Sequence, residues 1–464
     1  MLLEPRDQTL VERIRAAGQG HVLAFLPELD QPGRRRLLDQ LHEVDLAQLV
    51  RLAALVGAPA GGPAEPIAPP PLEEPDFTRR RELRELGWEA LRAGQVACLL
   101  VAGGQGTRLG WPGPKGTYPV APVSQKTLFQ LFGEQLYATS LRSGRAIPWY
   151  VLTSRENRAE TEAFLRSHDL FGLAPEQVRF LVQKDLPAVD GRGRMLLAQK
   201  DRIATSPNGH GGTLEALQSA GALARLQEEG IEHLFYFQVD NPLCRPCDPL
   251  FLGAHIAGEA DVSTKVVEKT DPGEKIGLVV LRGERPGVVE YSEMSPAEQQ
   301  RRDPDGKLSF RAGNTAIHVF SRAFLQGLTL GGFELPYHLA HKAVPYLGED
   351  GLFVDPPAPN AWKFETFIFD LFARAERHVA LVVDRAEDFE PLKNKSGPYS
   401  PDTVRRAQSE RHRRWLAAAG REVSAARVEV SALVALDPEE LAERLPELEL
   451  REEGDAASVG LDMA

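Results

Sequence analysis

The stretch Val96-Ala-Cys-Leu-Leu-Val-Ala-Gly-Gly-Gln-Gly-Thr-Arg-Leu-Gly110, continued by Pro114-Lys-Gly116, decides the fold of this chain. Its first seven residues, 96–102, form a short apolar run with a valine at or near each end, which predicts a fully buried strand. The run passes at once into a glycine-rich turn. The sequence therefore predicts a loop that leaves the end of a buried strand.

The residues of this loop are suited to binding phosphate. Gly103, Gly104 and Gly106 allow positive φ angles, and they carry no Cβ that would keep a ligand away from the backbone. Backbone N–H groups in such a turn form a concavity that binds anions, and a following helix N-terminus would add its dipole. Arg108 and Lys115 bring full positive charge to the same place. The combination predicts a phosphate site with catalytic groups.

Two better-known glycine motifs are excluded by their spacing. No register of residues 103–117 gives the P-loop pattern, which needs a Gly-Lys-Ser/Thr end. The dinucleotide fingerprint also fails, because three residues separate Gly106 from Gly110. A turn that only packs a strand against a helix is the remaining alternative. It explains the glycines but leaves Arg108 and Lys115 without a role.

Composition narrows the class of protein. The 464 residues carry a formal net charge of −12, which argues against a general binder of nucleic acids or anionic membranes. We find no run near the ~18 apolar residues of a membrane span. The first residues lack the basic-then-apolar pattern of a signal peptide, and three cysteines make a disulfide framework unexpected. We therefore expect a cytoplasmic protein.

The glycine motif resembles the signature of the UDP-sugar pyrophosphorylases, with Pro114-Lys-Gly116 as its second part. Its glutamine form is most similar to the UDP-N-acetylglucosamine (UDP-HexNAc) pyrophosphorylases. This resemblance implies that Arg108 and Lys115 are catalytic. It also implies nucleotide contacts from the motif's first residues, namely Gly103, Gly104, Gln105 and Gly106.

The order of predicted elements supports an α/β fold. Strands alternate with helices of ten to fifteen residues, which indicates a doubly wound, mostly parallel sheet; the resemblance implies a nucleotide-diphospho-sugar transferase core, which is GT-A-like and Rossmann-type. We expect a helical N-terminal region at 1–56 and a Pro-rich linker at 57–76. The catalytic core is expected at 77–386, and a small C-terminal domain with β structure and a disordered tail at 387–464.

Two further segments resemble nucleotide-binding parts of the family. Gln183 ends a predicted strand, and its amide could pair with a base edge or could simply face solvent. The resemblance implies that it reads uracil. Gly211 and Gly212 match the glycine pair whose backbone approaches the uridine, whereas Asn208 and His210 are interpreted as loop residues.

Asp240 follows another predicted buried strand, where it could bind Mg²⁺ or cap a helix. Magnesium prefers one or two carboxylates together with substrate phosphates. The resemblance assigns Asp240 to the metal and the nucleotide. The nearby Cys244 and Cys247 could form a redox pair or half a zinc site, but the only other cysteine is Cys98 in a buried run, so we expect no such role.

A sugar site is implied by later segments. Glu290 and Asn314 alone could be surface residues, yet carboxylates and amides around a formed pocket bind sugar hydroxyls. The resemblance carries over Gly277, Glu290 and Asn314 as hexosamine contacts.

Residues 360–370 are expected to begin a helix with an aromatic face, and His338 and His341 are expected on a helix. The resemblance places Lys363 and Phe367 in the sugar-phosphate pocket. It also makes Lys393, otherwise an ordinary exposed lysine, a catalytic contact to the sugar phosphate.

Together these segments imply a uridylyltransferase that uses UTP, an N-acetylhexosamine 1-phosphate and Mg²⁺. Transfer to glucose or galactose 1-phosphate, and a non-catalytic UDP-sugar binder, remain alternatives. We expect no nucleic-acid or membrane partner, and the oligomeric state, monomer or weak dimer, is not determined.

Overall fold

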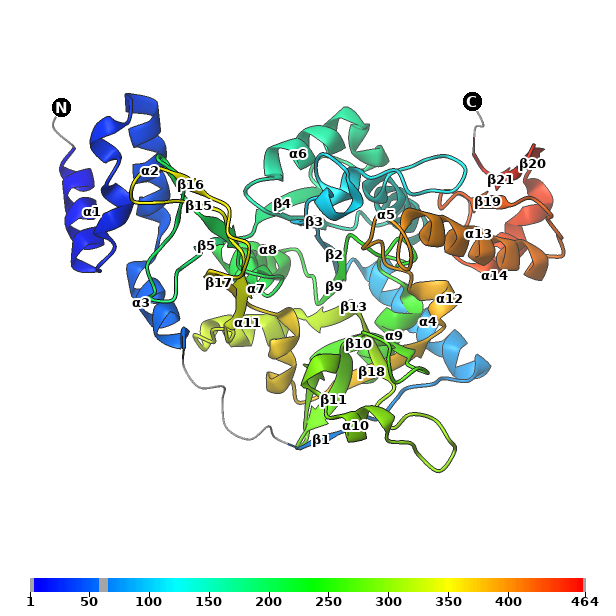
Figure 1. Cartoon of the computed structure of the whole chain (residues 1–464). Coiled ribbons are helices and arrows are strands. Elements are labelled where there is room, and N and C mark those ends of the chain that lie inside the picture. Colours follow the sequence, from blue (N-terminus) through cyan, green and yellow to red (C-terminus); the bar gives the residue numbers. More distant parts are fainter. Residues whose placement is uncertain (1–3, 58–65, 462–464) are drawn as a thin grey trace. The chain divides into compact units, whose positions relative to one another are not determined.

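The computed structural model describes residues 4–57 and 66–461 (Figure 1). Contacts divide the chain into two units. The smaller unit comprises Met1–Ala64, Gln183–Glu215 and Glu334–Asp370. The larger unit comprises Glu65–Val182, Ala216–Phe333 and Leu371–Ala464. Each unit therefore contains segments that are far apart in the sequence.

Across the described residues, the larger unit contains a ten-stranded mixed sheet. Its strands are β1 (Ile67–Ala68), β2 (Val96–Val101), β3 (Trp149–Thr153), β4 (Val178–Val182), β9 (His233–Gln238), β10 (Val262–Glu268), β11 (Leu278–Arg282), β12 (Arg285–Val289), β13 (Ala312–Ser321) and β18 (His378–Val383). The strands β4, β3, β2 and β9 run parallel, and β10 is parallel to β18. The strand β13 is antiparallel to β9, β10 and β11.

The predicted strand at 96–102 is confirmed as β2, which lies between β3 and β9. Cys98 pairs with Trp149 on one side, and Leu99 pairs with Tyr236 on the other. Neighbours on both sides and a covered face explain why the run is apolar without alternation. The α/β fold with a mostly parallel sheet is therefore confirmed.

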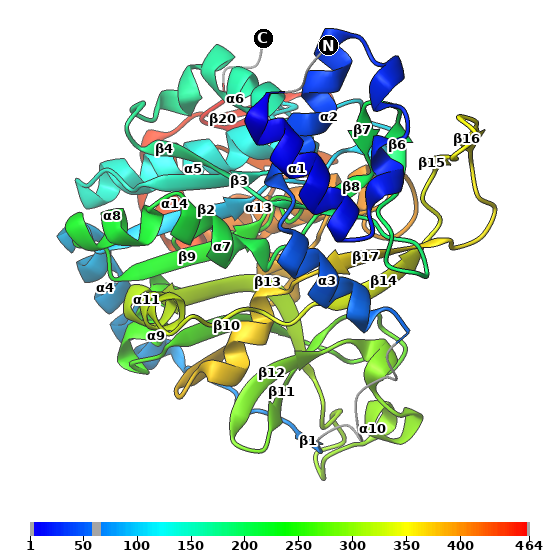
Figure 2. The ribbon, with the colours of Figure 1, turned by 90° about the vertical axis from the view of Figure 1, so that its left-hand side faces the viewer.

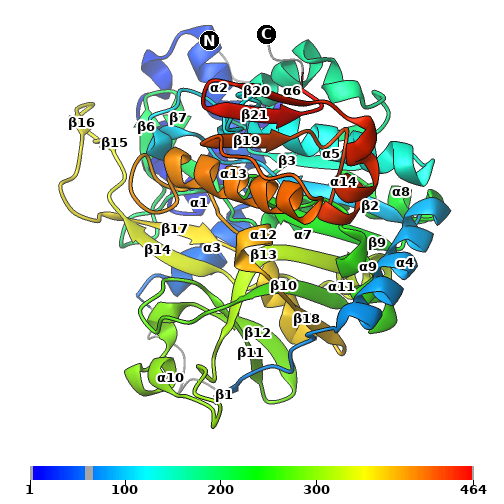
Figure 3. The same cartoon turned by 90° about the vertical axis from the view of Figure 1, so that its right-hand side faces the viewer.

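Helices cover both faces of this sheet, as Figures 2 and 3 show from opposite sides. On one face lie α8 (Ala222–Glu228) and α11 (Arg322–Leu330), and on the other lie α4 (Phe77–Ala93) and α9 (Pro249–Ala257). A Cβ on Gly87 of α4 would lie 1.9 Å from the carbonyl oxygen of Pro249, so only glycine permits this close crossing. The chain's other helices include α5 (Leu128–Ser143), α6 (Arg158–Ser167), α7 (Gly212–Ser219), α10 (Pro296–Gln300) and α12 (Arg385–Asp388).

The smaller unit begins with three helices, α1 (Pro5–Ala16), α2 (Gln31–Glu43) and α3 (Leu46–Leu55). Asp30 and Asp45 cap the second and third by accepting backbone N–H groups at 2.8 and 3.0 Å. The unit's strands are β5 (Asp185–Pro187), β6 (Leu197–Gln199), β7 (Arg202–Ile203), β8 (Thr205–Pro207), β14 (His338–Lys342), β15 (Tyr346–Leu347), β16 (Phe353–Val354) and β17 (Ala361–Glu365).

The expected helices at 338–341 and 360–370 are wrong. His338 and His341 lie on β14, which pairs antiparallel with β17, and a 3-10 turn follows at Ile368–Arg374. The apolar residues Trp362 and Phe364 are two apart, which is the period of a strand and not that of a helix.

The C-terminal part of the larger unit contains α13 (Pro401–Ala418), α14 (Pro438–Arg444) and a three-stranded sheet. Its strands are β19 (Arg427–Val430), β20 (Leu450–Glu453) and β21 (Ala456–Val459). The disordered tail, expected over the last ten residues of the chain (455–464), is wrong for Ala456–Val459, because β21 pairs with both other strands. Residues 462–464 lie outside the described residues. Small residues of β21, including Ala457 and Ser458, are buried.

The Pro-rich segment is described only in part. Residues 58–65 lie outside the described residues, while Ile67–Ala68 form β1 beside β11. Glu73 also forms a bridge to Leu381. The domain boundaries expected at residues 56, 76 and 386 remain a proposal.

Candidate functional site

The glycine-rich loop leaves the sheet at the carboxyl end of β2. Gly106 donates its backbone N–H to the carbonyl of Gly113 at 2.8 Å, and Lys115 donates its backbone N–H to the carbonyl of Gly104 at 3.1 Å. These two bonds fold residues 103–116 back on themselves. The lysine of the motif is therefore held beside its glycines, as a site for a charged phosphate requires.

The glycines of this loop differ in what they contribute. In this described loop, positive φ occurs at Gly110 (72°) and Gly113 (126°), and Gly103, Gly104 and Gly106 do not use the freedom that glycine gives them. A Cβ on Gly106 would lie 2.7 Å from the Cβ of Trp111. A Cβ on Gly104 would meet nothing within 4 Å, so this glycine opens the backbone to a ligand.

Two polar side chains of the loop are available to a ligand. The Oε1 atom of Gln105 is buried and has no hydrogen-bond partner among the described residues. A buried acceptor of this kind usually has a partner, which a ligand could supply. Arg108 is exposed on a 3-10 turn at Thr107–Leu109. The long helix α5 begins only at Leu128, so its N-terminus follows well after the glycines.

Three charged candidates converge at the carboxyl ends of β2 and β9. The backbone N–H of Leu392 donates to the carbonyl of Asp240 at 2.6 Å, and the carbonyl of Leu392 accepts from Nζ of Lys115 at 3.5 Å. Lys393, the next residue, has an exposed side chain. A single segment therefore brings Lys115, Asp240 and Lys393 together.

The three sugar-binding candidates of the larger unit also meet. Asn314 donates its backbone N–H to the carbonyl of Gly277 at 2.8 Å. A Cβ on Gly277 would lie 3.5 Å from Oε1 of Glu290, so this carboxylate stands against the glycine. Partial burial raises the pKa of Glu290, the neighbouring Glu293 raises it further, and the ammonium of Lys393 lowers it. Lys393 is therefore close to the same group.

The remaining candidates belong to the smaller unit. The buried Gln183 donates its side-chain amide to the carbonyl of Gly209. Gly211 donates its backbone N–H to Thr366 at 2.8 Å, and a Cβ there would lie 2.7 Å from the backbone nitrogen of Phe367. Gln183, the candidate for binding the base, thus holds the glycine turn in place. That turn packs on the segment that carries Phe367.

Gly212 and Lys363 are the other two candidates in the smaller unit. A Cβ on Gly212 would lie 2.0 Å from Oδ1 of Asn208, which explains the glycine. Lys363 is partly exposed on β17, paired with Ala340 of β14. Contacts within each unit therefore group its own candidates.

Sequence reasoning missed the side chains around Phe367. The ring of His210 stacks on Phe367 with centroids 5.3 Å apart, and the ring of His338 stacks on it at 4.4 Å. Burial lowers the pKa of His210 to about 4, and its Nδ1 accepts from the backbone of Ile368 at 3.1 Å. Asp370 pairs with His338 at 2.8 Å. The position of His210 between glycines in the short segment Asn-Gly-His-Gly-Gly was the signal that could have indicated its packing against Phe367.

Asn208 lies in the loop between β8 and α7, as predicted, and it makes several contacts there. It is buried, its Nδ2 donates to Glu215 at 3.1 Å, and its backbone carbonyl accepts from Thr366 at 2.7 Å. It therefore joins the glycine turn to the end of β17.

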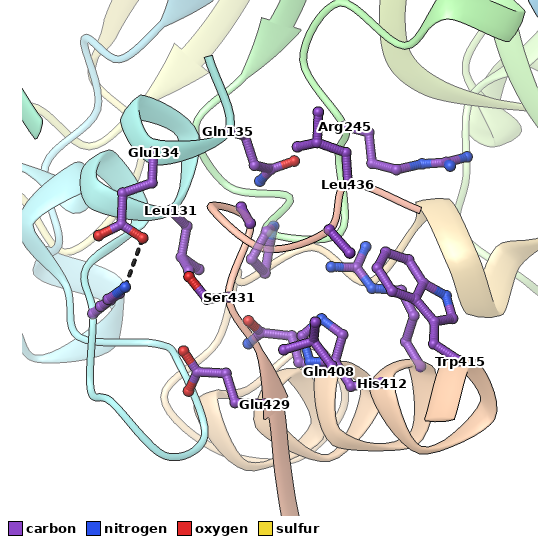
Figure 4. A pocket seen from close by; sticks show the side chains of 16 residues that line it. Leu131, Glu134, Gln135, Arg245, Gln408, His412, Trp415, Glu429, Ser431 and Leu436 are labelled. Atoms are coloured by element: carbon purple, nitrogen blue, oxygen red, sulfur yellow. Dashed lines mark hydrogen bonds and ion pairs between the residues drawn. The ribbon is translucent and has the colours of Figure 1, made fainter. Parts of the chain in front are cut away.

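A separate pocket lies between α5, the loop after β9, α13 and β19 (Figure 4). Glu134 pairs there with Lys126 at 2.6 Å, and Glu429 accepts two backbone N–H groups at 2.9 Å. None of the predicted site residues is among its lining residues. We therefore assign it no part in the predicted chemistry.

The described cysteines are all buried and free. Burial raises the pKa of the Cys98 thiol, and also that of Cys244. A thiol with a raised pKa stays protonated and is a poor nucleophile or metal ligand.

A metal ion at this site would need ligands from the substrate as well as from the protein. Among the described residues, no group of three or more His, Cys, Asp or Glu side chains could hold a metal ion. Asp240 supplies a single, partly buried carboxylate, and its backbone is linked to Lys115 through Leu392. Such a donor set fits Mg²⁺ only when phosphate oxygens complete the coordination.

None of the described helices is long and apolar enough to cross a membrane.

Comparison with known proteins connects these observations to a family. The sequence model of one family, described as UTP--glucose-1-phosphate uridylyltransferase, matches residues 65–400. The chain is 40% identical over 437 residues to UDP-N-acetylhexosamine pyrophosphorylase-like protein 1 of Homo sapiens, covering 89% of this chain and 86% of that protein. It is 38% identical over 352 residues to UDP-N-acetylglucosamine pyrophosphorylase of Saccharomyces cerevisiae, covering 74% of each.

A solved structure extends this likeness to the fold. The uridine diphosphate N-acetylglucosamine pyrophosphorylase from Trypanosoma brucei, in complex with an inhibitor, is similar with a TM-score of 0.81 and 27% identity. The match covers 96% of each chain.

Proposed function

We propose, from the premise that this chain belongs to the UTP--glucose-1-phosphate uridylyltransferase family, that it makes a UDP-N-acetylhexosamine from UTP. The acceptor is N-acetylglucosamine or N-acetylgalactosamine 1-phosphate. A phosphate oxygen of the acceptor forms a bond to the α-phosphorus of UTP. The bond from that phosphorus to the β-phosphate breaks, and pyrophosphate leaves with the electron pair.

The observation that carries the proposal is the contact chain from Lys115 through Leu392 to Asp240. In-line transfer between phosphates needs positioning and charge neutralisation more than a protein nucleophile. Lys115 and Arg108 would stabilise the triphosphate and the leaving pyrophosphate. Lys393, on the segment that joins the other two, would hold the incoming sugar phosphate.

The nucleotide would be bound by backbone and amide groups. Gly104 presents open backbone to the phosphates, and the free acceptor of Gln105 would take a hydrogen bond from the ligand. In the smaller unit, Gln183 would read uracil with its remaining amide oxygen, since its nitrogen already donates to Gly209. Gly211 and its neighbour would let the uridine approach the main chain.

Magnesium would be held by Asp240 and the substrate phosphates. When bound, it would neutralise charge on the phosphates during transfer. The chain's own residues then determine where those phosphates lie.

An N-acetylated sugar is favoured over glucose by the names of the relatives, which are UDP-N-acetylhexosamine or UDP-N-acetylglucosamine pyrophosphorylases or proteins like them. In the group of Gly277, Glu290 and Asn314, the carboxylate of Glu290 would accept hydrogen bonds from sugar hydroxyls. In the smaller unit, Lys363 and Phe367 are the candidates for contacts to the sugar phosphate. Glucose 1-phosphate is the second candidate, because the family description names it.

The test is pyrophosphate release with UTP, Mg²⁺ and a panel of sugar 1-phosphates, with Lys115→Ala as the control. Fast release with the two N-acetylhexosamine 1-phosphates supports the proposal. Release only with glucose or galactose 1-phosphate keeps the reaction and changes the sugar. Binding of a UDP-sugar without any release would indicate a non-catalytic binder.

A further inference from the structure

Four charged side chains contact one another where β10, the loop after β9 and the end of α12 come together. The Nζ atom of Lys265, on β10, donates to Asp248 at 2.6 Å and to Asp388 at 2.5 Å. The guanidinium of Arg245 lies 3.5 Å from each of the same two carboxylates. The two positive and two negative charges balance.

This cluster is deeply buried. Lys265 is 0% exposed, Asp248 is 5% exposed and Asp388 is 2% exposed. Burial alone would lower the pKa of Lys265, but Asp248 and Asp388 outweigh it and hold the pKa above its ordinary value. A buried ion pair often adds no net stability over apolar residues of similar size. Stability is therefore a weak explanation for keeping four such groups together.

The cluster is joined directly to the proposed catalytic residues. The backbone carbonyl of Asp388 accepts from Nδ2 of Asn241 at 2.7 Å, and Oδ1 of Asn241 accepts from the backbone of Glu390 at 3.2 Å. Asn241 follows Asp240 in the chain. Two residues beyond Glu390, the backbone of Leu392 bonds Asp240 itself. Three hydrogen bonds thus join residues 388–392 to Asn241 and to Asp240, the candidate metal ligand.

Two more contacts extend the reach of the cluster. The backbone carbonyl of Lys265 accepts from Oγ1 of Thr315 at 2.7 Å, next to Asn314 of the sugar group. From α13, Arg411 donates to the carbonyls of Leu243 and Glu387 at 2.9 and 3.2 Å. These contacts therefore fix the positions of β10, the loop after β9 and the end of α12 relative to one another.

We propose that Lys265 and Asp388 are positioning residues for the uridylyl transfer, setting the distance between Asp240 and Lys393. This inference rests on the proposed function. Neither side chain needs to touch substrate, because each acts through Asn241 and the 388–392 backbone. Small displacements of groups that hold phosphates slow transfer strongly.

The test uses two variants of the whole chain. Asp388→Asn keeps the shape and removes the charge. Lys265→Met/Asp388→Leu replaces the pair by apolar groups and leaves Asp248 paired with Arg245, so it is designed to fold. The matched control is Arg322→Met, which breaks a pair with Glu232 at 3.0 Å beside the opposite, amino-terminal end of β9.

Four readouts separate positioning from stability. In both test variants we expect kcat to fall about 10- to 100-fold, as for residues that orient metal ligands. The KM for UTP should stay near the wild-type value, because the glycine loop is untouched. Amide hydrogen exchange should accelerate at Glu390 and Leu392 but not in β2. Thermal midpoints should not order the variants by their kcat values.

Other results would overturn the proposal. A double variant with wild-type kcat and wild-type exchange at Glu390 and Leu392 would do so. Equal losses of kcat in the double variant and in Arg322→Met would also do so, because both would then report stability alone. If the wild type releases no pyrophosphate with any sugar phosphate, the proposed function fails, and unchanged exchange in Asp388→Asn would separately refute the positioning link.

Discussion

Two lysines of the larger unit, Lys265 and Lys115, differ in their burial and in their partners. Lys265 is fully buried and contacts two carboxylates, so its charge is already neutralised within the protein. Lys115 is partly exposed, and among the described residues its Nζ contacts only the carbonyl of Leu392, at a long 3.5 Å. A phosphate offers a stronger, charged acceptor than that carbonyl. The charge of the first lysine is therefore neutralised inside the protein, whereas that of the second is left available to a ligand.

We expect Lys115→Met to lower kcat about 100- to 1000-fold, the loss typical of removing a donor that stabilises transition-state charge. Arg108→Ala should act in the same direction. Both changes should leave the thermal midpoint near that of the wild type, because neither side chain is deeply packed. Steady-state pyrophosphate release and thermal unfolding measure the two effects.

The control for these variants is Lys307→Met. Lys307 is exposed and pairs with Glu268 at 3.0 Å on the surface, where such pairs contribute little. It should keep wild-type kcat. Near-wild-type turnover in Lys115→Met would remove that residue from the mechanism.

At the scale of elements, the crossing of α4 and α9 depends on two glycines. A Cβ on Gly253 would lie 1.7 Å from the carbonyl oxygen of Leu83, in the same way that one on Gly87 would strike Pro249. Each helix thus presents a glycine to the backbone of the other. This close approach places α9 over β10, and Asp248 caps α9 by accepting from Leu250 at 3.1 Å.

We expect Gly87→Ala to lower the free energy of unfolding by about 1–3 kcal/mol, because the added methyl group must push two backbones apart. Gly327→Ala is the matched change, since it also lies within a helix but a Cβ there meets nothing within 4 Å. That change should raise stability by up to about 1 kcal/mol. Urea unfolding curves of both variants test the pair, and equal effects would contradict the packing argument.

At the scale of the whole molecule, several histidines are held neutral by burial. Burial lowers the pKa values of His210, His233 and His378 to about 4, and those of His255 and His412 to about 3. Their ordinary value is 6.5. Between these pH values the unfolded chain binds protons that the folded chain does not. Stability therefore rises with pH through this window and is lost as the pH falls below 6.5.

We expect the urea midpoint to fall clearly between pH 7 and pH 5. A histidine with a folded pKa of about 4 contributes roughly 2 kcal/mol to that loss by pH 5. His255→Gln should flatten the dependence, because an amide can still bond Ser263 but does not titrate. A midpoint that is flat between pH 7 and pH 5 in the wild type would refute this expectation.

Much of the fold could be predicted from local patterns. The apolar run at 96–102, the alternation of strands and helices and the glycine motif all depend on residues close in the sequence. Period and turn chemistry encode them directly, which is why the sequence predicts β2 and the strands that end near Gln183 and Asp240. The prediction of a helix at 360–370 is wrong because β17 pairs with β14, whose residues lie 19 to 27 positions earlier, as in Lys342–Ala361 and His338–Glu365.

The sequence by itself determined which chemistry this chain carries: a glycine loop with Arg108 and Lys115, an acid after a buried strand, and a late lysine. Only the tertiary structure decided that Leu392 joins Lys115 to Asp240, that Glu290 faces Gly277, and that Lys265 lies between two carboxylates. These contacts bring together residues from separate segments of the chain. Local propensity carries no information about such pairs, because packing of the whole sheet sets them.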